Sequence, residues 1–201
     1  VVVGGVLYKL IPLGDGTVAY AASEGYLLVD AKKCQGCATC MLACSLAHEG
    51  VENLSLSRIQ VLQNSFAGTP NDLSLVVCRQ CVYPACAEAC PTGALHVDES
   101  NGNVRTIDED KCIGCLRCVE ACINETSGVA WNPEEIHSQK CDLCADTPFW
   151  NEQGGAGGKQ ACIEVCPVSA ILFTSEIPSE DIGYEVNLRG EAWASLGLPT
   201  D

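Results

Sequence analysis

Cysteine is the residue type through which this chain could do chemistry, and sixteen cysteines occur among its 201 residues. They are gathered into four tight groups of four thiols, where a disulfide scaffold would scatter them. The groups are Cys34, Cys37, Cys40 and Cys44; Cys78, Cys81, Cys86 and Cys90; Cys112, Cys115, Cys118 and Cys122; and Cys141, Cys144, Cys162 and Cys166. Thiols at this density either pair as disulfides or bind metal, and the grouping favours metal.

The spacing within the groups indicates the metal. The first and third groups read C-x2-C-x2-C-x3-C, the bacterial ferredoxin spacing for a [4Fe–4S] cluster, and the second and fourth are variants with a longer second gap. Three closely spaced cysteines let the backbone curl around the cluster, with peptide N–H groups directed at sulfur. Gly36 and Gly114 lie inside such curls, where a missing side chain permits close approach. The sequence therefore predicts four [4Fe–4S] clusters.

Two other ligand types fit less well. A structural or regulatory zinc protein is the alternative from another class, but zinc ribbons use two C-x2-C pairs and leave no role for a third cysteine at the next step. His48, His96 and His137 are not expected to be ligands, because sixteen thiols already match the sixteen corners of four clusters. The glycine run at 154–158 lacks the first Gly and the Ser or Thr of a phosphate-binding loop, and we interpret it as a flexible insertion.

The composition supports an interior built from clusters. Only three Phe, three Trp and one Met are present, too few large apolar side chains for an ordinary core. The net charge of −15 argues against nucleic acid as a partner. Neither an apolar run long enough to cross a membrane nor an export signal is visible, so we expect no membrane span and a cytoplasmic protein.

Short strands should flank the cysteine groups. Ala94–Asp98 and Val104–Ile107 are expected to form a hairpin around the Asn101–Gly102 turn signal. The more distant segments Tyr26–Asp30 and Ala170–Thr174 should pair, since the opening and closing strands of a ferredoxin unit meet. Leu56–Gln63 alternates apolar and polar residues before a turn, which predicts a second hairpin.

These elements predict an α+β fold of two bacterial-ferredoxin-like modules, one inserted in the other, with small antiparallel hairpins and short helices. The outer module spans 26–73 and 123–175, and the inserted module spans 74–122. An N-terminal extension covers 1–25. A C-terminal tail over 176–201 should dock on a partner or on this chain, since it carries Tyr184, Leu188, Trp193 and Leu196.

The order of the groups, their gaps, and the Cys90–Pro91 and Cys166–Pro167 pairs resemble those of a known family. Over residues 26–174 the chain resembles the four-cluster iron–sulfur subunit of molybdenum and tungsten oxidoreductases of the dimethyl-sulfoxide-reductase type. Its short length is similar to that of the small subunits accompanying tungsten enzymes of the aldehyde-oxidoreductase family, including the benzoyl-CoA-reducing type. Ser45 and Ile123 stand where a Pro could follow the fourth cysteine, so helices are expected to continue there.

The resemblance implies crossed ligation, in which the fourth cysteine of each group binds the cluster of another group. Cys34, Cys37 and Cys40 would share a cluster with Cys166; Cys141, Cys144 and Cys162 with Cys44; Cys78, Cys81 and Cys86 with Cys122; and Cys112, Cys115 and Cys118 with Cys90. The alternative pairs group one with group two and group three with group four.

The resemblance also implies a non-catalytic subunit that relays single electrons. Its partners would be a catalytic subunit with a tungsten or molybdenum pterin and a soluble redox protein or further electron-transfer subunit. The sequence itself contains no nucleophile–base pair and no nucleotide-binding fingerprint. A free polyferredoxin, or an electron-transfer subunit of a carbon monoxide dehydrogenase or hydrogenase, remains the alternative.

Overall fold

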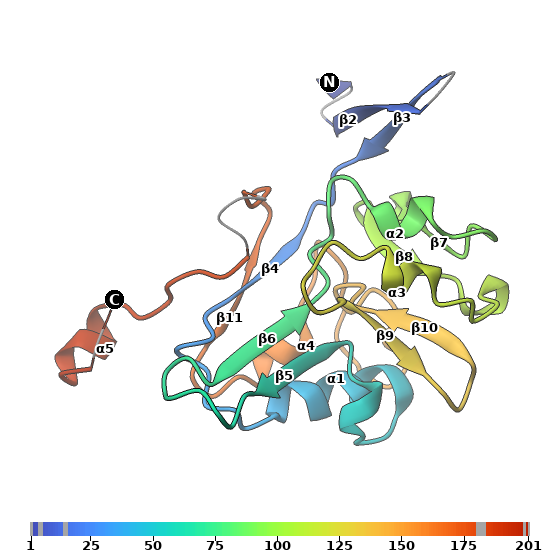
Figure 1. Cartoon of the computed structure of the whole chain (residues 1–201). Helices are drawn as coiled ribbons and strands as arrows, with labels where there is room; N and C mark the ends of the chain where they lie inside the picture. Colours follow the sequence, from blue (N-terminus) through green and yellow to red (C-terminus); the bar gives the residue numbers. More distant parts are fainter. Residues whose placement is uncertain (1, 4–5, 14–15, 180–183, 199, 201) are drawn as a thin grey trace.

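The computed structural model describes residues 2–3, 6–13, 16–179, 184–198 and 200. Short antiparallel strands and short helices alternate along the chain (Figure 1). The strands are β1 (Val2–Val3), β2 (Val6–Leu13), β3 (Gly16–Ala21), β4 (Tyr26–Val29), β5 (Ile59–Gln63), β6 (Leu73–Val77), β7 (Leu95–Asp98), β8 (Val104–Ile107), β9 (Val129–Asn132), β10 (His137–Lys140) and β11 (Ile171–Thr174). Apart from a three-stranded β1–β2–β3 sheet, the described strands pair two by two. Small paired strands with short helices are the elements expected of a ferredoxin-type α+β fold.

The predicted pairing of distant segments is confirmed. β4 and β11 lie antiparallel, with Val29 opposite Ile171 and Tyr26 opposite Thr174. The strand stops before Asp30, whose carboxylate accepts the Lys33 backbone N–H at 3.0 Å and so turns the chain toward the first cysteine group. This pair joins the beginning of group one to the end of group four.

The two predicted hairpins are also present, with differences at their ends. β7 pairs with β8, but their connection is a 3₁₀ turn at Glu99–Asn101 followed by Gly102, because Asp98 accepts the Ser100 N–H at 3.0 Å. β5 pairs with β6 and begins later than expected. The residues before it form a second 3₁₀ turn at Leu54–Leu56.

The β9–β10 hairpin was not predicted from the sequence. It connects groups three and four, and its residue Val129 packs with Leu95 and Cys118. The polar residues of β10 from His137 to Lys140 are all buried. A strand of four buried polar residues lacks the apolar alternation by which strands are recognised in a sequence.

Four of the described helices carry the third cysteine of a group at their second residue. They are α1 (Thr39–Glu49), α2 (Ala85–Glu88), α3 (Arg117–Glu120) and α4 (Ala161–Glu164). α1 packs against α4, and α2 packs against α3. α1 continues past Ser45 until Gly50 ends it in a left-handed conformation at φ 70°, as expected. α3 ends at Glu120, so the expected continuation through Ile123 is wrong; Ala121 closes the helix and Cys122 turns its sulfur to the Gly128 N–H.

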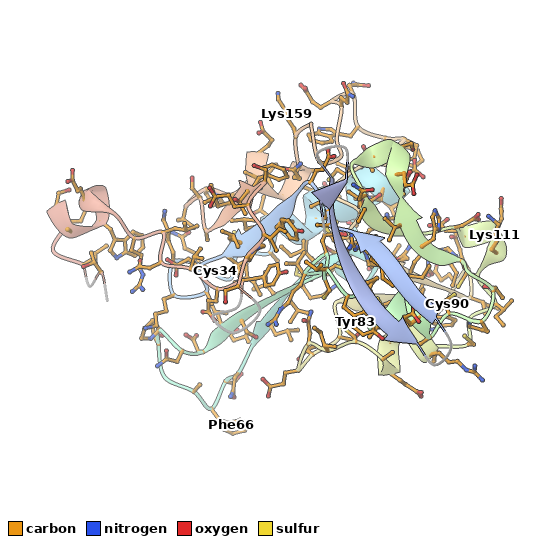
Figure 2. The ribbon with its side chains drawn as sticks, turned by 90° about the horizontal axis from the view of Figure 1, so that it is seen from above. Cys34, Phe66, Tyr83, Cys90, Lys111 and Lys159 are labelled. Atoms are coloured by element: carbon orange, nitrogen blue, oxygen red, sulfur yellow. The ribbon has the colours of Figure 1, made fainter. Side chains whose placement is uncertain are left out.

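The terminal segments contact the rest of the chain at a few points. The ring of Tyr20 at the end of β3 meets Tyr83 edge-on, 6.4 Å between centroids, where the β2–β3 hairpin passes group two (Figure 2). The sequence Gly14–Asp15–Gly16 also predicts a turn after an apolar stretch, and residues 14 and 15 lie outside the described residues. At the other terminus Tyr184 is buried and Val29 bridges to Glu185, so part of the tail docks on β4. Beyond it, α5 (Glu191–Ser195) projects from the body (Figure 1).

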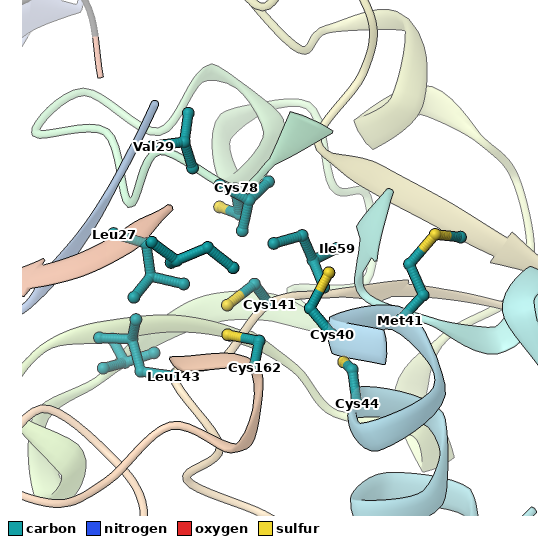
Figure 3. Close-up of a cluster of buried hydrophobic side chains, with 13 residues drawn as sticks. Leu27, Val29, Cys40, Met41, Cys44, Ile59, Cys78, Cys141, Leu143 and Cys162 are labelled. Atoms are coloured by element: carbon teal, nitrogen blue, oxygen red, sulfur yellow. The ribbon is translucent and has the colours of Figure 1, made fainter. Parts of the chain in front are cut away.

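The main core is built around cysteines. Cys40, Cys44, Cys78, Cys141 and Cys162 are buried in one cluster with aliphatic side chains such as those of Leu27 and Ile59 (Figure 3). The core therefore brings together thiols of groups one, two and four. Among the described residues, no helix is both long and apolar enough to cross a membrane.

Candidate iron–sulfur sites

Four cavities are each lined by four cysteines. Their sulfur-bearing linings are Cys78, Cys81, Cys86 and Cys122; Cys90, Cys112, Cys115 and Cys118; Cys44, Cys141, Cys144 and Cys162; and Cys34, Cys37, Cys40 and Cys166. We name them cavities A, B, C and D in that order. Each combines three thiols of one group with the fourth thiol of another group. These tetrads are the same sets that the family resemblance groups together.

The same backbone curl recurs in every group. The second residue after the first cysteine has a positive φ in all four groups, at Gly36 (67°), Gln80 (48°), Gly114 (67°) and Leu143 (60°). In the first two of these positions the N–H is also directed at the first cysteine's sulfur, at 3.4 Å. The curl turns the chain back on itself and lets three thiols converge, which explains why glycine is favoured but not obligatory there.

The fourth cysteine of every group accepts a backbone N–H at its sulfur. The donors are Arg58 to Cys44 at 3.3 Å, Leu95 to Cys90 at 3.4 Å, Gly128 to Cys122 at 3.4 Å and Ala170 to Cys166 at 3.2 Å. Such bonds stabilise negative charge on sulfur, as a metal-bound thiolate requires. Leu95 is the first residue of β7, and the other three donors immediately precede β5, β9 and β11, which gives those strands a direct role in the sites.

Burial raises the pKa of most enclosed thiols; at Cys44 the effect of burial is outweighed by hydrogen bonds and nearby charge, with the bond to His48 the largest of these, and the pKa is lowered. Burial raises the pKa of Cys144 to about 12 and the pKa of Cys162 well above its usual range. At the surface, a hydrogen bond from the Thr39 hydroxyl lowers the pKa of Cys37. A buried thiol with a raised pKa ionises only when a cation binds it, so metal occupancy of cavity C would release protons and add to folding stability.

The four sites differ in exposure. Cys115 in cavity B and Cys37 in cavity D are exposed, while all four cysteines of cavity C are buried. Figure 2 shows Cys34 and Cys90, from cavities D and B, on opposite sides of the molecule. Two of the sites therefore reach the surface and one is enclosed.

A charged network surrounds cavity C. Asp142 accepts hydrogen bonds from His48 at 3.0 Å and from the Arg58 guanidinium at 3.1 Å, and His48 also lies 3.8 Å from the Cys44 sulfur. Burial by itself would raise the pKa of Asp142, but the His48 hydrogen bond and the Arg58 charge bring it down to about 2. The sequence placed His48 outside the ligand set; the structure gives it a hydrogen-bonding role beside that set.

The other histidines also have protein partners. His96 Nδ1 lies 3.0 Å from the Ala94 carbonyl oxygen. His137 is buried between two carboxylates, 3.4 Å from Glu109 and 3.6 Å from Glu135. Of the three histidines, only His48 lines one of the four cysteine cavities described here, and that cavity is C.

The glycine run at 154–158 packs tightly, contrary to the expected flexible insertion. A Cβ on Gly154 would lie 1.8 Å from the carbonyl oxygen of Cys144, and Gly155 donates its N–H to Leu143 at 2.8 Å. Gln160 donates its side-chain amide to Gly155 and Gly158. Glycine is needed because the loop backbone lies against the cavity C curl.

A further cavity of about 240 Å³, larger than cavities A to D, contains no cysteine. It lies between β6 and the segment at Tyr184–Glu185, with Arg79 stacked 5.4 Å over the Tyr184 ring. The candidate cluster sites are therefore distinguished by converging thiols and N–H donors, and not by cavity size.

Comparison with known proteins agrees with these observations. Residues 73–176 match the family of 4Fe–4S dicluster domains. The chain is 37% identical to the thiosulfate reductase electron transfer subunit PhsB of Salmonella typhi, over 77% of each chain. It is 36% identical to the polyferredoxin-like subunit of the Pyrococcus furiosus aliphatic sulfonate oxidoreductase, over 70% of each chain. It is 35% identical to the beta subunit of NADH-dependent phenylglyoxylate dehydrogenase of Aromatoleum evansii, over 75% of this chain and 31% of that one.

The chain therefore belongs to the 4Fe–4S dicluster family. The sequence-based prediction of a non-catalytic, iron–sulfur electron-transfer protein is confirmed, because these relatives are named electron-transfer or oxidoreductase subunits. The thiol tetrads and their N–H donors fit the thiolate chemistry that such clusters require.

Proposed function

We propose that the chain holds four [4Fe–4S] clusters and relays single electrons between a redox partner and the catalytic subunit of an oxidoreductase. The observation that carries this proposal is the sorting of all sixteen cysteines into four cavities of four. Each cluster would be bound by thiolates and would supply one-electron chemistry. The protein's own contribution is to hold the thiols, direct N–H groups at sulfur and set the surrounding charge.

The ligand sets proposed are the crossed ones, with Cys166 completing the first group's site, Cys44 the fourth group's, Cys122 the second group's and Cys90 the third group's. Their support is the lining of the cavities, each of which includes one thiol from a second group. Cavities C and D would lie in an outer module of residues 26–73 and 123–175, and cavities A and B in a module of residues 74–122 inserted in it. The α1–α4 and α2–α3 packing supports this division.

The relay would run B–A–C–D. Cys86 of cavity A packs in one cluster with Cys118 of cavity B. The main core brings together Cys78 of cavity A, Cys141 and Cys162 of cavity C, and Cys40 of cavity D. Electrons would enter and leave at the ends, where Cys115 and Cys37 are exposed.

The end at cavity B has a surface suited to docking. Ile113 beside it is 63% exposed and Ile136, which faces Gly114, is 64% exposed. Exposed apolar side chains around a thiol near the surface are typical of a protein–protein contact. We propose a catalytic subunit with a tungsten or molybdenum pterin at one end, a soluble redox protein or further electron-transfer subunit at the other, and a cytoplasmic location. A free polyferredoxin, or a subunit of a carbon monoxide dehydrogenase or hydrogenase, is the second candidate.

Paired cysteine variants test the crossed ligand sets. If Cys122 and Cys81 bind one cluster, the double Cys122→Ala, Cys81→Ala variant loses no more iron than either single variant. The control double variant Cys122→Ala, Cys115→Ala should then lose two clusters. Iron per chain is measured after anaerobic purification. Loss of two clusters from the Cys122, Cys81 variant and of one from the Cys122, Cys115 variant would reject crossed ligation.

The subunit role is tested on the native protein. Anaerobic size-exclusion chromatography of material from its own cells should place the chain in a larger complex that contains tungsten or molybdenum. Elution as a single 21.2 kDa species would favour the free carrier. A complex lacking both metals would reject the pterin partner.

A further inference from the structure

Three of the four cysteine groups have a lysine directly before their first cysteine, and these lysines have different surroundings. Lys111 is exposed, with 62% of its side chain accessible, and pairs with Asp108. Lys33 is half-buried and donates to the carbonyls of Ser169 and Leu188. Lys140 is 2% exposed. The same sequence position therefore places one cation in solvent and another in the interior (Figure 2 shows Lys111 at the periphery).

Lys140 has no acidic partner among the residues that the structure describes. Its ammonium group donates to the carbonyl of Arg105 and, at 3.2 Å, to that of Cys141. It thus lies between β8, which borders cavity A, and the first thiol of cavity C. Carbonyl dipoles solvate an ammonium group only in part and leave its charge uncompensated.

Arg105 repeats the arrangement on the wall of cavity A. It is 1% exposed and lines that cavity with Cys78 and Cys81. Its guanidinium donates to the carbonyls of Asn103, Ala21 and Val82. Throughout the described chain no carboxylate pairs with it. One buried cation therefore lies on the wall of cavity A, and a second, Lys140, is hydrogen-bonded to the backbone of the first.

Arg58 shows what an internally compensated cation looks like in the same protein. It is nearly as buried, but it pairs with Asp142 at 3.1 Å and with Glu49 at 3.5 Å. A buried cation without such a partner is strongly destabilising, so a compensating negative charge is required beside Lys140 and Arg105. The cavity A thiols are the available groups: Arg105 lines the cavity with them, Lys140 is hydrogen-bonded to the Arg105 carbonyl, and thiolates that bind a cluster are negatively charged.

We propose that Lys140 and Arg105 are the built-in counter-charges of the cluster in cavity A, and that Lys140 raises that cluster's reduction potential. This rests on the proposed function, since it requires a cluster in cavity A. When the cluster accepts an electron from the reduced redox partner, its negative charge increases by one. A fixed cation favours that step, and the low polarity of a buried site strengthens the effect.

Redox titration of the anaerobic holoprotein, followed by electron paramagnetic resonance, tests the proposal. Lys140→Met removes the charge and keeps the length of the side chain. One midpoint potential should fall by about 59 mV or more. For a one-electron couple this shift corresponds to a tenfold or larger change in the reduction equilibrium constant. The other midpoints should move less. Lys111→Met, at the matched position before Cys112, should leave all midpoints unchanged, because water and Asp108 already screen that charge.

The outcomes are separable by measuring iron in the same samples. Unchanged midpoints in a Lys140→Met protein with full iron would overturn the proposal. If Lys140→Met loses one cluster or fails to fold, Lys140→Arg decides: retention of that cluster by the charge-conserving variant supports a counter-charge, and equal loss contradicts it. Low iron in the unaltered protein would reject the proposed function instead, before any variant is compared.

Discussion

Cavities B and C have the same four-thiol chemistry in opposite settings. Cavity C is enclosed, with all four cysteines buried and an Arg58–Asp142–His48 network around it. Cavity B has the exposed Cys115, and its neighbouring Lys111–Asp108 pair lies in solvent. The difference indicates that the thiols of cavity C are part of the structural core, while the proposed cluster in cavity B would be better placed for exchange with a partner.

The largest effect should come from removing a thiol at each site. Cys162→Ala opens the main core and removes a ligand of cavity C, so holoprotein yield and thermal stability should both collapse. Cys115→Ala should lose about one cluster, roughly four irons per chain, and leave the rest of the protein folded. Iron analysis with thermal unfolding under argon measures both. Equal damage from the two variants would remove the distinction between the cavities.

A smaller effect is expected from breaking an ion pair at each site. Asp142→Asn removes the carboxylate that Arg58 and His48 share, leaves Arg58 only its longer contacts with Glu49 and Glu109, and should destabilise the protein by about 3–5 kcal/mol. Asp108→Asn, which breaks the exposed pair beside cavity B, should produce no measurable change. Guanidinium unfolding followed by cluster absorbance gives both results. A stable Asp142→Asn protein would show that the network contributes nothing to cavity C.

The smallest effect concerns the glycines of two matching curls. Gly36 and Gly114 have the same φ of 67°, so Ala at either position should cost roughly 1–2 kcal/mol in backbone strain. A Cβ at Gly114 would also lie 2.7 Å from the Ile136 carbonyl oxygen, whereas at Gly36 it would meet only the flexible Leu73 side chain at 3.3 Å.

Gly114→Ala should therefore broaden the electron paramagnetic resonance signal of the cluster in cavity B and lower the iron content there. Gly36→Ala should leave the cluster in cavity D at full iron content. Electron paramagnetic resonance and iron analysis of the two variants provide the comparison. If Gly36→Ala is the more damaging substitution, the β9–β10 turn at Ile136 does not constrain cavity B.

Features that depend on local spacing could be predicted from the sequence. Apolar alternation and turn residues predict the β7–β8 and β5–β6 hairpins. The order of the cysteine groups predicts the pairing of β4 with the distant β11. The network at Cys44 could not, because His48, Arg58 and Asp142 come from three separate segments that only the tertiary fold unites. Likewise nothing local distinguishes Lys140 from Lys111, since both precede a C-x2-C pair and only packing buries one of them.

The number of clusters is the central claim, and quantitative iron and acid-labile sulfide analysis of the anaerobically purified chain tests it most directly. Four loaded cavities require sixteen irons and sixteen sulfides, in keeping with sixteen cysteines arranged as four tetrads. About eight irons per chain after full reconstitution, as two clusters would give, would contradict the account.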